Sequence, residues 1–181
     1  MKRLLGVVVM LLLGLTLVSP TATAAPAAPY CGLTWGSLRE NVPRYSEATV
    51  QDVRSGRHDC FDRMVVDLRG DVRGYDVRYV SVVRADGSGA AVPLRGGARL
   101  AVVVRAPAYD QSGDPTYQPA DPRELTNVAG YRTFRQIAWA GSFEGQTTIG
   151  LGVRARLPFR VLILDGPGTG SRLVVDVAHR W

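Results

Sequence analysis

The feature that most limits the fold is a period of two in the apolar residues, which begins near residue 49 and recurs along the rest of the chain. In residues 61–69, Met64, Val66 and Leu68 fall on one face, and Arg63, Asp67 and Arg69 fall on the other. Successive side chains of a strand point to opposite faces, so this pattern places one face in a core and the other toward solvent. Helical periodicity is weak throughout this part of the chain, which is therefore predicted to be built from strands.

Eight segments of this kind are separated by Gly, Pro and Asp, the residues that favour turns. We predict strands over residues 49–54, 61–69, 75–79, 100–105, 137–142, 147–153, 159–165 and 173–178. The first is a candidate edge strand, and the nearly all-apolar 100–105 is expected to be central. The fold class is all-β, an antiparallel β-sandwich of about seven or eight strands, with a barrel as the alternative. Single helical turns are expected only at 37–41 and 123–131.

One connection is much longer than the others. Residues 106–127 form a segment of 22 residues with four prolines, and loops of this length are usually functional or mobile. Tyr109 and Tyr117 of this segment are expected to be exposed, where they could stack on sugar rings, whereas Trp139 lies in an apolar strand and is expected in the core.

The N-terminus has the pattern of a secretory signal peptide. Lys2 and Arg3 precede an apolar run over 4–18, and Ala22 and Ala24 follow with the spacing of a cleavage site. The apolar run is shorter than the roughly 20 residues of a spanning helix, and we expect no membrane span. The predicted division is a signal peptide over 1–24, an N-terminal segment over 25–48 and one β-sandwich domain over 49–181.

The chain has two cysteines, Cys31 and Cys60. In an exported protein two cysteines favour one disulfide, which would close a loop of about 30 residues and stabilise the fold by roughly 3–4 kcal/mol. The alternative is that Cys60 is a nucleophile activated by His58, two residues away and on the same face if both lie on a strand.

The formal net charge is +6, and removal of the signal peptide would leave 20 Arg and 16 acidic residues, or +4. An exported basic protein would meet anionic envelope polymers or lipid head groups rather than nucleic acid. The charges are scattered singly, so a bias toward arginine that serves no binding role explains them equally well.

Other chemistry finds little support in the sequence. The glycine-rich "LDGPGTGSRL" leads into a strand, so it is predicted to be a turn and not a phosphate-binding loop. His58 and His179 could join Asp59, Asp62 or Asp176 at a metal ion, but none of them has the spacing of a ligand set. No metal and no cofactor is expected, and no pair of carboxylates stands out as a glycosidase site.

The strand segments resemble a known family when they are taken in order. "GRHDCFDRMVVDL", "GYDVRYV", "FEGQTTIGLGV", "PFRVLIL" and "SRLVVDVAH" are similar to the successive motifs of the AMIN-like domain of actinobacterial exported proteins. The resemblance implies a β-sandwich related to the AMIN domain, a non-catalytic module that directs cell-wall amidases to the envelope and peptidoglycan. The family pattern corresponds to Gly56, His58, Phe61, Asp62 and Arg63, and it carries no catalytic residue over to this chain.

The leading hypothesis is a secreted, non-enzymatic module that binds a cell-wall polymer or an envelope protein. The candidate binding residues are Arg57, His58, Asp62, Arg63, Tyr109 and Tyr117. Asp62 and Arg63 could instead pair with neighbouring strands. One alternative is a secreted hydrolase, which requires a pocket that holds both His58 and His179. Another is a protein-interaction module that uses a sheet edge or the 106–127 loop.

Overall fold

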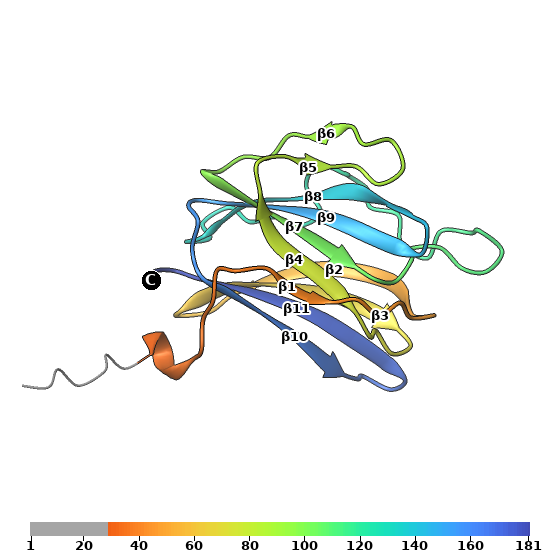
Figure 1. Ribbon diagram of the computed structural model, residues 1–181, viewed down its shortest axis with the longest axis horizontal. Coiled ribbons are helices and arrows are strands. Elements are labelled where there is room, and N and C mark those ends of the chain that lie inside the picture. The colour runs from red at the N-terminus through yellow and green to blue at the C-terminus, as the bar shows by residue number, and fades with distance from the viewer. Residues whose placement is uncertain (1–28) are drawn as a thin grey trace, which may run out of the picture.

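The computed structural model describes residues 29–181, so the predicted signal peptide lies outside the described residues. Two antiparallel sheets face each other as the two layers of a sandwich (Figure 1). One has five strands in the order β1-β4-β7-β9-β8, and the other has four in the order β10-β11-β3-β2. The elements are η1 (Tyr30–Gly32), β1 (Glu40–Val42), β2 (Thr49–Arg57), β3 (Phe61–Arg69), β4 (Tyr75–Val80), β5 (Val83–Arg84), β6 (Ala91–Val92), β7 (Ala98–Val104), β8 (Phe134–Phe143), β9 (Gln146–Val153), β10 (Phe159–Asp165) and β11 (Gly170–Ala178).

The predicted all-β sandwich is confirmed, and each of the eight predicted strands overlaps an observed one. β2 lies at a sheet edge and β7 at the centre of its sheet, as expected. Both predicted helical turns are wrong. Residues 37–41 run into the edge strand β1, and residues 123–131 form non-helical turns. β5 and β6, a two-stranded hairpin across the turn at 85–90, are too short to show a period.

The core lies between the two sheets and is built by the inward-facing positions of the period-two pattern. The four-stranded sheet contributes residues that include Met64, Val66, Leu173 and Val175, and the five-stranded sheet contributes Leu100, Val102, Ile149 and Leu151. All of these are fully buried. Trp139 is half-buried and packs against this core.

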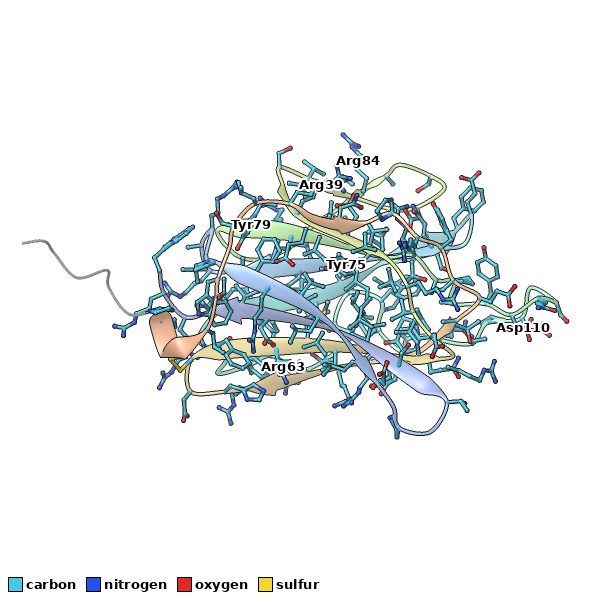
Figure 2. The ribbon with its side chains drawn as sticks, turned by 60° about the horizontal axis from the view of Figure 1, so that its bottom comes forward. Arg39, Arg63, Tyr75, Tyr79, Arg84 and Asp110 are labelled. Atoms are coloured by element: carbon cyan, nitrogen blue, oxygen red, sulfur yellow. A yellow bond between two sulfur atoms is a disulfide. The ribbon has the colours of Figure 1, made fainter. Side chains whose placement is uncertain are left out.

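The long segment after β7 closes one side of the sandwich. Its backbone bonds to edge strand β8, where Leu125 N donates to Ile137 O and Trp139 N donates to Pro122 O. It also reaches edge strand β2, where Val50 N donates to Pro107 O. An unpaired sheet edge can associate with other chains, and this segment covers part of the edges of β8 and β2. Most of the segment therefore has a structural role. Its exposed tip lies around Asp110 (Figure 2).

The N-terminal segment closes part of the opposite side. Gly36 pairs with Phe159 at the edge of β10, and the ring of Trp35 lies 5.8 Å from that of Phe61. The predicted disulfide is confirmed, with the Cys31 and Cys60 Cα atoms 6.4 Å apart. It holds this segment against the turn between β2 and β3, and the candidate site adjoins that turn.

Candidate functional site

A hollow of about 340 Å³ lies beside the turn between β2 and β3. We call it the β2–β3 hollow. β2 ends at Arg57, β3 begins at Phe61, and His58, Asp59 and Cys60 form the turn. The chain before β8 and the chain after β11 complete the hollow. It is lined by Arg57, His58, Asp59, Asp62, Gly130, Arg132 and His179.

Asp62 and His179 are the buried side chains of the hollow. Asp62 is 1% exposed and accepts hydrogen bonds from the backbone N–H groups of Thr133 (2.6 Å) and Phe134 (3.0 Å). The His179 ring lies 3.2 Å from Asp62 Oδ1 at Nε2 and 3.2 Å from Asp59 O at Nδ1. The carboxylate thus ties β3, β8 and the chain after β11 together, and satisfied buried networks of this kind are rigid.

The exposed side chains of the hollow are mainly hydrogen-bond donors. The His58 ring stacks on Phe61 with 4.5 Å between the centroids, and the Arg57 guanidinium lies 5.9 Å from the centre of the Tyr131 ring. Arg132 Nη1 donates to Asp59 O over 3.4 Å, and Asp59 adds an exposed carboxylate. Two guanidiniums and an imidazole beside one exposed carboxylate suit a polar or anionic ligand.

Three of the predicted site residues meet at this hollow, namely Arg57, His58 and Asp62. Arg63 does not, because it points to the outer face of the four-stranded sheet and bonds Asp176 at 2.6 Å. Sequence analysis missed Arg132 and Gly130. Both lie in the irregular segment before β8, where no local pattern marks a binding residue.

The exposure expected for the two loop tyrosines is wrong. Tyr109 is half-buried, and its hydroxyl accepts a 3.0 Å hydrogen bond from Gly145 N. Tyr117 packs against the core with its ring 5.4 Å from that of Trp139. Both tyrosines make contacts within the protein, because the long segment is folded onto the sandwich.

The structure also bears on the catalytic alternatives. Cys60 is in a disulfide, so it is not a free nucleophile. His58 and Cys60 lie in a turn and not on one strand face. The two histidines do share a hollow, as the hydrolase hypothesis requires, but both ring nitrogens of His179 face acceptors inside the protein.

No cluster of three or more His, Cys, Asp or Glu side chains suited to a metal ion occurs within residues 29–181. Asp176, one of the carboxylates considered with the histidines, lies between Arg63 and Arg160 instead. In the same part of the chain, no helix has the length and apolar character to cross a bilayer.

A larger hollow, of about 1090 Å³, lies elsewhere. It is lined in part by Glu47, Arg69, Asp71, Arg73 and Asp110, and by none of the predicted binding residues. Its charges alternate in sign, so it does not favour one charge of ligand.

Comparison with known proteins gives one match. The family model described as the AMIN-like domain matches residues 48–179. No curated protein and no solved structure matches the chain. The matched stretch contains every strand from β2 to β11 and all residues that line the β2–β3 hollow.

Proposed function

This chain belongs to the AMIN-like domain family, and from that premise we propose that it is a secreted, non-catalytic module that binds a cell-wall polymer at the β2–β3 hollow. The family suggests a wall-related binding module, and the disulfide suits an extracytoplasmic protein. Peptidoglycan and the anionic polymers attached to it are the ligand candidates.

The observation that carries the proposal is that exposed hydrogen-bond donors lie above buried side chains that are held rigid. Arg57, His58 and Arg132 reach the hollow from two separate parts of the chain. Asp62 and His179 beneath them are locked by hydrogen bonds. Binding to such a site requires little ordering of the protein, which favours affinity.

Sedimentation with purified peptidoglycan, with and without its anionic polymers, tests the proposal. The informative variant is Arg57→Ala/Arg132→Ala. Each lost charge-assisted hydrogen bond is worth about 1.5–3 kcal/mol, and 1.4 kcal/mol is tenfold in affinity. We expect the variant to bind at least tenfold more weakly than the parent protein.

The matched control is Arg84→Ala/Arg123→Ala, which removes the same charge from exposed positions outside the hollow. Equal losses in the two double variants would attribute binding to overall arginine charge and refute the site. Binding that survives about 1 M salt, where the Debye length is about 3 Å, would identify specific recognition of the polymer.

A secreted hydrolase is the second candidate, because His58 and His179 line the same hollow. Release of soluble sugar or peptide fragments from the same wall preparation would establish it, and His58→Ala should then abolish the release. A wall that is bound but left intact supports the binding module.

A further inference from the structure

Two large apolar side chains project into solvent close to one arginine. Leu38 is 79% exposed and Trp181 is 69% exposed. Arg156 links them, because its Nη2 donates to Ser37 O over 3.2 Å and its backbone oxygen accepts a 3.2 Å hydrogen bond from Trp181 Nε1. The indole is therefore held in place while its ring remains in water.

The surroundings of these side chains are basic. A second hollow of about 340 Å³ is lined by Tyr79, Val80, Ser81, Gly97, Ala98, Arg99 and Arg156. Of the described residues that line it, none is acidic. Arg154 bonds the backbone oxygen of His179, and Arg180 lies 4.6 Å from the centre of the Tyr30 ring. Leu38, Arg99, Arg154, Arg156, Arg180 and Trp181 together are called the Trp181 surface.

The nearby carboxylate of Asp76 does not offset this charge. It is buried and bonded by Arg39 at 2.6 Å and by Arg78, so two cations already face one anion. Tyr79, which Arg156 overlies at 4.9 Å, and Asp110 lie toward opposite ends of the molecule (Figure 2). The Trp181 surface is thus at the end away from the large mixed-charge hollow.

We propose that the Trp181 surface docks the protein on an anionic lipid bilayer, with Trp181 and Leu38 at the boundary between head groups and acyl chains and a lipid phosphate between Arg99 and Arg156. Tryptophan favours this interfacial depth. Each basic residue near an anionic leaflet contributes about 1 kcal/mol. A soluble phosphate polymer would satisfy the arginines but would offer no apolar medium for Leu38 and Trp181, so a membrane fits the whole surface better.

Cosedimentation with phosphatidylglycerol vesicles tests this docking, with phosphatidylcholine vesicles as the neutral reference. We expect Leu38→Ser/Trp181→Ser to weaken binding to the anionic vesicles at least tenfold. The matched control is Phe143→Ser/Ile163→Ser, which removes two other exposed apolar side chains and should bind as the parent protein does. The tryptophan fluorescence of the parent should shift to the blue on binding, because the exposed Trp181 would leave water for the bilayer interface. Trp35 and Trp139 are already half-buried, so they should contribute little to the shift.

Equal binding by the two double variants, or equal binding to neutral and anionic vesicles, would overturn the proposal. A tenfold loss of binding to soluble polyphosphate in Leu38→Ser/Trp181→Ser would also overturn it, and would make a phosphate polymer the ligand. These variants leave Arg57 and Arg132 unchanged, so the outcome is independent of the wall-binding test.

Discussion

The outer face of the four-stranded sheet is covered by ion pairs, whereas much of the outer face of the five-stranded sheet is covered by a flap of chain. Arg63 lies on the first face and Arg84 lies in the flap, on opposite sides of the molecule (Figure 2). Both faces have to shield buried residues, and the comparison shows two physical solutions to one problem.

On the four-stranded sheet, Asp176 lies between Arg63 and Arg160, its neighbours on the two adjacent strands. The carboxylate is fully buried and pairs with Arg63 at 2.6 Å and with Arg160 at 2.8 Å. Val65 and Val174 on the same face are also buried. Long arginine stems can cover apolar surface while their head groups stay near water.

On the five-stranded sheet, the chain around β5 and β6 supplies the cover. We call these residues, 83–95, the flap. Val83 and Leu94 pack on Ala101, Ala138 and Ala140 and make a small second core. Strand β9 leaves space for them with the glycines of its "GLG" motif. A Cβ at Gly152 would lie 2.1 Å from Arg95 O. A flap of chain therefore needs small residues beneath it. Arginine side chains can cover a sheet face without that requirement.

The largest effect is expected from Asp176→Ala, which would leave two partly buried arginines without their shared partner. Removing one member of a buried pair costs about 3–5 kcal/mol, and we expect the free energy of unfolding in urea to fall by about 3 kcal/mol. The control Asp67→Ala breaks the pair with Arg54, whose side chain is 52% exposed, and should cost less than about 1 kcal/mol. Equal losses of unfolding free energy in the two variants would show that the Asp176 ion pairs stabilise the protein no more than an exposed ion pair does.

A smaller effect is expected from Gly152→Ala, because the new methyl group meets backbone that cannot move without the flap. Overpacking of this kind costs about 1–3 kcal/mol. Faster amide exchange in residues 83–95 would show that the flap has loosened. Gly150→Ala is the control, since its methyl group meets the flexible end of Leu94 at 2.9 Å and should change exchange less. The reverse order would contradict this account of the flap.

The smallest expected effect is on the pH dependence of stability, which should have opposite signs for the carboxyl groups of Asp86 and Asp76. Burial raises the pKa of Asp86 in the flap, against hydrogen bonds from Thr148 and Gln146. Its contribution to stability is therefore present below the ordinary carboxyl pKa and is lost as pH rises through the raised value. Asp86→Asn should remove this loss. After correction for the intrinsic pH dependence of exchange, the protection of flap amides in this variant should not fall as the pH rises above the ordinary carboxyl pKa, whereas in the parent protein it should.

Asp76, in strand β4 of the five-stranded sheet, provides the opposite case. Burial opposes its ionisation, but hydrogen bonds from Arg39 and Arg78 outweigh burial and lower the pKa of Asp76. Its contribution is present above the ordinary carboxyl pKa and is lost as pH falls through the lowered value. Asp76→Asn should therefore destabilise the protein at neutral pH. Stabilisation at neutral pH by Asp76→Asn would refute the assigned sign.

Part of the candidate site could be predicted because it is local in the chain. Arg57, His58 and Asp62 lie within six positions, so one turn brings them together whatever the rest of the fold does. Arg132 could not be predicted, since it comes from an irregular segment 75 positions after Arg57 that only tertiary packing brings to the turn. Arg63 follows Asp62 in the chain but lies on the other face, because successive side chains of a strand alternate.

The sequence by itself determined that the protein is all-β and which strand positions face the core, because a period of two is a local property that survives any arrangement of the sheets. It also contained the pair of cysteines that the disulfide uses. Only the tertiary structure decided that the strands form two packed sheets and not a barrel, that the long segment closes an edge, that His179 meets Asp62, and that Ser37 and Trp181 both bond Arg156. These contacts join residues distant in the chain, and their energies depend on burial and geometry that no local pattern encodes.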